Sequence, residues 1–209
     1  MGYEILLYIP NLIGYARLSL LVASLVYFER PWIFLCLYAV SVSLDAVDGI
    51  AARALKQTSA FGAWFDVLID LISRGALWCF LSKWGYFMMM IEWLTFVCTH
   101  ARGPGWKIPK EDFPAICKMV MANGFKTPIG TYTITGIFVL PLWLYGMTSG
   151  FLSDNFGLDL TIQYVVMVIL CGGRVLGLIT EVCHLKCVGN HDRDMTFHSS
   201  KFWRWLTFE

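Results

Sequence analysis

Four aspartates inside two otherwise apolar segments constrain this chain more than any other feature of its sequence. Asp45 and Asp48 lie in the first segment, and Asp66 and Asp70 lie in the second. A carboxylate inside a segment apolar enough for a membrane is costly, and it is rare unless a partner offsets its charge. The two segments are therefore expected to bring their carboxylates together at a functional site.

The spacing of the acids predicts how they lie. Asp45 and Asp48 are three residues apart and Asp66 and Asp70 are four apart, so each pair shares one face of a helix. The polar stretch Lys56-Gln57-Thr58-Ser59 between the pairs predicts a turn that joins antiparallel helices. At about 1.5 Å per residue, both pairs lie at matching depths of roughly 8 to 15 Å from that turn. We therefore expect all four carboxylates to point into one cavity.

Such a cavity predicts a hard divalent metal. Four like charges in a cleft of low dielectric constant repel one another unless cations lie among them. A ligand set made only of oxygen suits Mg²⁺ or Mn²⁺ and argues against zinc or copper. The alternative is a salt-bridge network within the hairpin in which Arg53 offsets one aspartate, but one cation cannot neutralise four anions. Small residues on the hairpin would let a ligand approach the backbone closely. They are Gly49, Ala51, Ala52, Gly62 and Ala63.

The apolar runs predict an integral membrane protein. Hydrophobic residues make up 57% of the 209 residues and charged residues only 15%, which is too apolar for a soluble domain of this size. Six segments have about the length that a bilayer requires. They run near residues 12–29, 31–54, 60–82, 84–100, 125–148 and 160–187. We predict an all-α integral membrane fold with six transmembrane helices, in which residues 1–209 form a single polytopic catalytic domain.

The N-terminal residues and the net charge disfavour two other classes. Residues 1–9 are interpreted as a short amphipathic lead-in on the membrane surface, followed by a break at Pro10-Asn11. They do not resemble a signal peptide, because their first charge is acidic and no cleavage site of small residues follows. A net charge of +1, without a basic run that contains aromatic residues, gives no argument for nucleic-acid binding.

The basic residues predict the orientation in the membrane. Of the 16 lysines and arginines, three lie inside the predicted spans, two lie on one side of them and the other eleven lie on the opposite side. The positive-inside rule then places both termini and the turn at 54–60 in the cytosol. Because Asp48 and Asp66 lie close to that turn, the carboxylate cavity is expected to open to the cytosol.

The acid-bearing hairpin also carries a family motif. The segment DAVDGIAARALKQTSAFGAWFDVLID fits the signature D-x2-D-G-x2-A-R-x8-G-x3-D-x3-D at every fixed position. These positions are Asp45, Asp48, Gly49, Ala52, Arg53, Gly62, Asp66 and Asp70. On this motif the chain resembles the CDP-alcohol phosphotransferase family, the integral membrane enzymes of phospholipid synthesis. Two further stretches, Ile9–Arg17 and Ala51–Gln57, resemble the eukaryotic phosphatidylinositol synthase branch.

The resemblance implies roles for the motif residues. It implies that Asp45, Asp48 and Asp66 bind the metal and the nucleotide diphosphate, and that Asp70 is the catalytic base with a further metal contact. It implies small residues around the cytidine and polar residues around the phosphates. The residues implied to bind the CDP-alcohol are Gly49, Ala52, Arg53, Gly62, Asn11 and Arg17. The alternative for Arg17 is that it snorkels to the interface or pairs with an aspartate without touching substrate.

The same resemblance implies a reaction and a location. The enzyme would transfer a phosphatidyl group from CDP-diacylglycerol to a small alcohol, in this branch myo-inositol, and release CMP at the endoplasmic reticulum membrane. The second half of the chain departs from the branch. It has Glu92 in the fourth span in place of an aspartate, and Lys118–Lys126 lacks the arginine of a Tyr-Tyr-x-x-Arg-like stretch. Loss of a guanidinium fork changes how a polyol is recognised. Another acceptor alcohol therefore stays open, as does a non-catalytic scaffold or transporter that retains the fold.

Other charges in the second half leave alternatives open. Glu92 is predicted either to line the acceptor pocket or to pair with Arg74. Arg174 is predicted either to face that pocket or to form an ion pair between helices that includes Glu181. The GxxxG-like spacing of glycines around Arg174 is typical of close helix contact, and it leaves a homodimer interface open.

Overall fold

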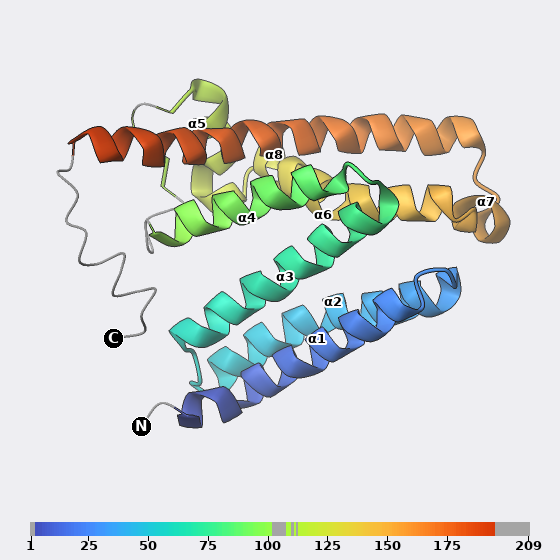
Figure 1. The fold of residues 1–209 in the computed structure, drawn as a ribbon, viewed down its shortest axis with the longest axis horizontal. Helices are drawn as coiled ribbons and strands as arrows, with labels where there is room; N and C mark the ends of the chain where they lie inside the picture. The colour runs from blue at the N-terminus through green and yellow to red at the C-terminus, as the bar shows by residue number, and fades with distance from the viewer. Residues whose placement is uncertain (1–2, 102–107, 110, 112, 195–209) are drawn as a thin grey trace. The chain divides into compact units, whose positions relative to one another are not determined.

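The computed structural model describes residues 3–101, 108–109, 111 and 113–194, and no strand occurs among them. Its helices are η1 (Tyr3–Leu7), α1 (Ile9–Val26), α2 (Pro31–Ala54), α3 (Ala60–Leu81), α4 (Gly85–Ala101), α5 (Ala115–Met121), η3 (Ala122–Phe125), α6 (Pro128–Thr148), α7 (Phe151–Phe156) and α8 (Leu160–Asp194) (Figure 1). The predicted all-α class is confirmed. The chain divides into two compact units, one of residues 1–90 with 138–169 and one of residues 91–137 with 170–209.

Four helices of the described chain are long and apolar enough to cross a bilayer, which indicates an integral membrane protein. They are Ile9–Val26, Pro31–Ala54, Pro128–Thr148 and Leu160–Lys186. The predicted count of six spans is not confirmed. α3 has sufficient length but carries Asp66, Asp70 and Arg74 in its middle, and α4 has only 17 residues. The termini, residues 1–2 and 195–209, lie outside the described residues, so their expected cytosolic location stays a prediction.

α1 and α2 form an antiparallel pair at the start of the chain. The break predicted at Pro10-Asn11 is wrong, because α1 begins at Ile9 and Pro10 lies in its first turn. Proline suits that turn, since the N–H that it lacks would have no helical partner there. α2 likewise begins with Pro31. The short connection at 27–30 turns the chain back, and the two helices pack along each other (Figure 1).

The turn between α2 and α3 is set by two helix caps. Lys56 has a φ of 55°, and the N–H of Gln57 donates 2.9 Å to the carbonyl of Ala52, so α2 ends in a left-handed C-terminal cap. α3 then begins after Ser59, whose Oγ accepts a 3.0 Å hydrogen bond from the N–H of Gly62. The two caps fix where each helix starts and ends, and therefore fix the register between the acid pairs.

The core of the first unit is built from large apolar side chains of α1, α2, α3 and α6. Its buried members are Leu21, Phe34, Tyr38, Phe65, Ile69, Leu77 and Tyr145. The hydroxyl of Tyr145 donates a 2.6 Å hydrogen bond to the carbonyl of Phe28, which holds α6 to the end of α1. A Cβ at Gly14 would lie 2.8 Å from the ring of Phe65, so only glycine lets α1 approach α3 this closely.

In the second unit, α8 packs closely against α6 through glycines. A Cβ at Gly173 would lie 2.6 Å from the carbonyl oxygen of Tyr132, and one at Gly136 would overlap the backbone nitrogen of Arg174. A Cβ at Gly177 would lie 2.9 Å from the side chain of Ile137. The GxxxG-like glycines therefore make a contact within the chain.

α5 lies between the fourth and fifth predicted spans, and it packs on α8. Phe113, Cys117, Met121 and Cys183 form the buried cluster there. The two thiol sulfurs are 2.6 Å apart, and burial raises the pKa of Cys117 to about 12. A buried thiol behaves as a small hydrophobic side chain, which suits the apolar cluster around it.

Candidate active site

The guanidinium of Arg17, on α1, lies among the carboxylates of all four aspartates of α2 and α3. Its Nη1 is 2.6 Å from Asp48 Oδ2 and 2.6 Å from Asp66 Oδ1. Its Nη2 is 2.6 Å from Asp45 Oδ1 and 3.2 Å from Asp70 Oδ1. The Arg17 side chain is only 2% exposed. The cation at the centre of the cluster is therefore Arg17. The alternative of a salt-bridge network within the hairpin expected Arg53 in this position.

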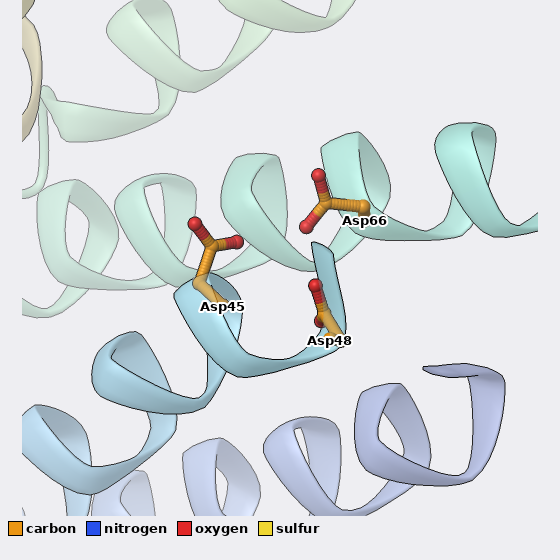
Figure 2. A group of neighbouring side chains, drawn as sticks. All are labelled: Asp45, Asp48 and Asp66. Atoms are coloured by element: carbon orange, nitrogen blue, oxygen red, sulfur yellow. The ribbon is translucent and has the colours of Figure 1, made fainter. Parts of the chain in front are cut away.

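Three of the carboxylates form a set that fits a divalent metal. One oxygen each from Asp45, Asp48 and Asp66 lies within 4.8 Å of the others. Figure 2 shows these side chains gathered from α2 and α3, with their carboxylates turned toward one another. The donors are all hard oxygens, which Mg²⁺ and Mn²⁺ prefer. The guanidinium of Arg17 shows that the cluster accommodates positive charge. The donor set suits either of the two metals.

Asp70 lies beside this three-oxygen set. Its Oδ1 is 3.2 Å from Arg17, and its Oδ2 is 3.9 Å from Nη1 of Arg74 one turn further along α3. The guanidinium of Arg74 in turn lies 4.1 Å from the centre of the Phe138 ring. The Asp70 side chain is 29% exposed, so a carboxylate oriented by two arginines stays accessible to a reacting group.

An open pocket adjoins the acid cluster. It has a cavity volume of about 160 Å³ and is open to solvent. It is lined by the first turns of α1, the end of α2, the turn and the first turns of α3. Among its lining residues are Asn11, Gly49, Ala52, Arg53 and Gly62 together with Asp48 and Asp66. The structure thus brings together every predicted CDP-binding residue except Arg17, which lies among the carboxylates and not on the pocket wall.

Close contacts shape the pocket wall. The Nδ2 of Asn11 donates a 2.6 Å hydrogen bond to the carbonyl of Ile5, and its Oδ1 would lie 2.8 Å from a Cβ at Gly62. The side chain of Arg53 is exposed, and a guanidinium nitrogen would lie 3.6 Å from a Cβ at Gly49. A Cβ at Gly62 would therefore displace the Asn11 side chain, whereas the wall at Gly49 has ordinary space.

Gln57 is a lining residue to which the sequence pattern assigns no role. Its Oε1 accepts a 3.0 Å hydrogen bond from the backbone N–H of Ile9. The only signal for it in the sequence is its place in the polar turn and in the Ala51–Gln57 stretch that resembles the synthase branch. A hydrogen bond between residues 48 positions apart leaves no trace in local periodicity.

A second cluster of buried charge lies in the second unit. Arg174 Nη1 is 3.0 Å from Glu181 Oε2 along α8, and its Nη2 is 3.4 Å from Glu92 Oε1 on α4. Glu92, Arg174 and Glu181 are at most 7% exposed. The two residues predicted for the acceptor pocket, Glu92 and Arg174, thus pair with each other. The pair between Arg174 and Glu181 lies within α8 and not between two helices.

Comparisons with known proteins agree with the motif. Residues 7–176 match the CDP-alcohol phosphatidyltransferase family. The chain is 44% identical over 81 residues to CDP-diacylglycerol–inositol 3-phosphatidyltransferase 1 of Arabidopsis thaliana, which covers 38% of this chain and 36% of the relative. It is 39% identical over 95 residues to the Saccharomyces cerevisiae CDP-diacylglycerol–inositol 3-phosphatidyltransferase, which covers 42% of each chain. It is 46% identical over 75 residues to the Homo sapiens protein of the same name, which covers 35% of each.

These alignments therefore span well under half the length of the curated relatives. No solved structure matches the chain significantly. The family match extends over most of the chain and includes every residue of the acid cluster and of the pocket. This chain belongs to the CDP-alcohol phosphatidyltransferase family.

Proposed function

We propose that this protein transfers a phosphatidyl group from CDP-diacylglycerol to a small alcohol, myo-inositol, and releases CMP. The observation that carries the proposal is the pocket formed by the family motif, which opens onto the carboxylates of Asp48 and Asp66. Inositol as the acceptor is supported by the names of the plant, yeast and human relatives, all inositol 3-phosphatidyltransferases.

In this proposal Asp45, Asp48 and Asp66 hold Mg²⁺ or Mn²⁺, which when bound would supply positive charge to the diphosphate and stabilise the departing CMP. The pocket holds the cytidine against the glycines of α2 and α3, with Arg53 toward the phosphates. Asp70 accepts the proton of the acceptor hydroxyl. The hydroxyl oxygen then bonds to the phosphorus of the phosphatidyl group as the bond from that phosphorus to CMP breaks.

The acceptor side is proposed to include Glu92 and Arg174. Glu92 is buried on α4, and polyols are recognised by buried hydrogen-bonding groups of this kind. The two residues form an ion pair inside the second unit. A different acceptor alcohol is the alternative, favoured by the absence of arginine from Lys118–Lys126.

We further propose six spans, with α3 and α4 added to the four apolar helices. α3 has 22 residues, and its acids pair with Arg17 and Arg74, so its charges enter the membrane with partners. The basic residues favour a cytosolic pocket and cytosolic termini in the endoplasmic reticulum membrane, where the water-soluble nucleotide end of the substrate is accessible.

A homodimer stays a prediction. The glycines of α8 do not support it, because they contact α6 of the same chain.

The test is an acceptor panel. Purified protein is incubated with radiolabelled CDP-diacylglycerol and Mg²⁺, with myo-inositol or with other small alcohols, and CMP and lipid products are measured. We expect CMP release with inositol and the appearance of phosphatidylinositol, both abolished in Asp66→Asn. Turnover with another alcohol alone would replace inositol as the acceptor. A folded protein that releases no CMP with any alcohol would contradict the assignment as a transferase.

A further inference from the structure

We infer that Arg17 is an internal counter-ion that holds the place of the metal. It neutralises the acid cluster before metal binds, is displaced when the metal enters, and then turns toward the phosphates of the nucleotide. This inference rests on the proposed function for its two ligands, the divalent cation and the cytidine diphosphate. The family resemblance implies only that Arg17 contacts the CDP-alcohol, and it gives Arg17 no role toward the metal.

The contacts of Arg17 overlap with those that a metal would need. Nη1 lies between Asp48 and Asp66, and Nη2 contacts Asp45. These are the three carboxylates whose oxygens lie within 4.8 Å of one another. A guanidinium keeps its charge at any physiological pH. A divalent cation among the same carboxylates would repel it at short range, so the two cations compete for one set of ligands.

The fold fixes the backbone of Arg17 beside the pocket. The hydroxyl of Ser41 donates a 2.9 Å hydrogen bond to the Arg17 carbonyl, which ties this turn of α1 to α2. One turn earlier, Gly14 packs against Phe65. Asn11 and Gly14 both line the pocket, and Arg17 follows them at the three-residue spacing that continues one helix face. A displaced guanidinium would therefore have the pocket, the proposed place of the nucleotide, within reach.

Metal affinity without substrate tests the competition. Mn²⁺ binding to detergent-purified protein is measured by electron paramagnetic resonance of the free ion, for wild type and for Arg17→Gln. We expect Arg17→Gln to bind Mn²⁺ at least about tenfold more tightly, because its ligands no longer hold a competing charge. Equal or weaker binding in Arg17→Gln would overturn the inference, as would the absence of Mn²⁺ binding in both proteins.

Arg74→Gln is the matched control, because it also removes a buried arginine, but one that lies 3.9 Å from Asp70, outside the three-oxygen set. We expect it to raise Mn²⁺ affinity by about threefold or less, through long-range charge alone. An effect as large as that of Arg17→Gln would show that any loss of positive charge suffices, and would contradict displacement. Arg17→Lys keeps the charge on one nitrogen and should fall between wild type and Arg17→Gln, which keeps the test available if Arg17→Gln does not fold.

The second half of the inference predicts a coupling between metal and nucleotide. CDP offers the displaced guanidinium a new partner, so CDP should raise Mn²⁺ affinity in wild type, and Mn²⁺ should raise CDP affinity by the same factor. In Arg17→Gln this coupling factor should shrink severalfold. An unchanged factor would refute movement toward the phosphates. No turnover is needed for these measurements, so their failure and a failure to release CMP are separate results.

Discussion

The backbone N–H of Ile9 donates a 3.0 Å hydrogen bond to Oε1 of Gln57, across 48 residues of sequence. Ile9 begins α1, and Gln57 belongs to the turn between α2 and α3. The donor is one of the first N–H groups of α1, which have no carbonyl partner within the helix. The Gln57 side chain therefore caps α1 from a distance and joins two walls of the proposed nucleotide pocket.

Gln57→Leu should loosen that pocket. Loss of the bond leaves the Ile9 N–H without its partner, and we expect the free energy of unfolding to fall by about 0.5 to 1.5 kcal/mol. The KM for CDP-diacylglycerol should rise severalfold with a smaller change in kcat. Steady-state kinetics and thermal unfolding measure both effects. Thr58→Val, at the next lining position, is the control, and an equal loss of stability there would argue against a cap by Gln57.

Asp70→Asn should separate chemistry from binding. The amide retains the shape of the carboxylate but cannot accept the proton, so kcat should fall by about 10² to 10⁴. Metal-dependent CDP binding, followed by calorimetry, should stay within a few-fold of wild type because Asp70 lies outside the three-oxygen set. Asp66→Asn should instead lose that binding. Normal turnover by Asp70→Asn would exclude it as the base.

Two glycines of the motif should differ in their tolerance of a methyl group. In Gly62→Ala the added Cβ would lie 2.8 Å from Asn11 Oδ1, whereas in Gly49→Ala it would lie 3.6 Å from the Arg53 guanidinium. We expect Gly62→Ala to displace Asn11 and raise the KM for CDP-diacylglycerol at least about tenfold, because small misplacements at a binding site are costly. Gly49→Ala should fold normally. If the two variants behaved alike, the contact with Asn11 would not be what requires glycine.

The acceptor assignment can be tested within one ion cluster. Glu92→Gln and Glu181→Gln each remove one carboxylate that contacts Arg174. If Glu92 faces the acceptor, Glu92→Gln should raise the KM for inositol by about tenfold while leaving the KM for CDP-diacylglycerol unchanged. Glu181→Gln should lower thermal stability without that selective effect. Matching kinetic effects in both variants would assign the cluster to packing alone.

The hairpin was predictable because its determinants are local. Acids at three- and four-residue spacing, a polar turn and small residues give a helix pair with a defined register. As expected, α2 ends close to Lys56 and α3 begins directly after Ser59. The family follows from the same stretch. The six-span count was not confirmed, because α3 carries three charged residues in its middle and α4 has only 17 residues.

Side-chain partners were harder to predict than helices. The sequence pattern around Arg17 is the same for an arginine that binds phosphate and for one that binds carboxylates. Only the packing of α1 against α2 and α3 shows that Arg17 contacts the acids. Glycines such as Gly173 indicate a close helix contact but not which helix makes it, and here the contact is with α6. A proline such as Pro10 occurs both just before a helix and in its first turn. The predicted start of the first span was therefore placed after Pro10, whereas α1 begins at Ile9.

The order of the helices along the chain has a consequence for biogenesis. A polypeptide is synthesised from its N-terminus, so α1 leaves the ribosome before the acid-bearing hairpin does. Arg17, which pairs with Asp48 and Asp66, is therefore synthesised before the aspartates of α2 and α3 enter the lipid. A chain cut between α1 and α2 would have to bury its aspartates without Arg17, with only Arg74 on α3 beside Asp70.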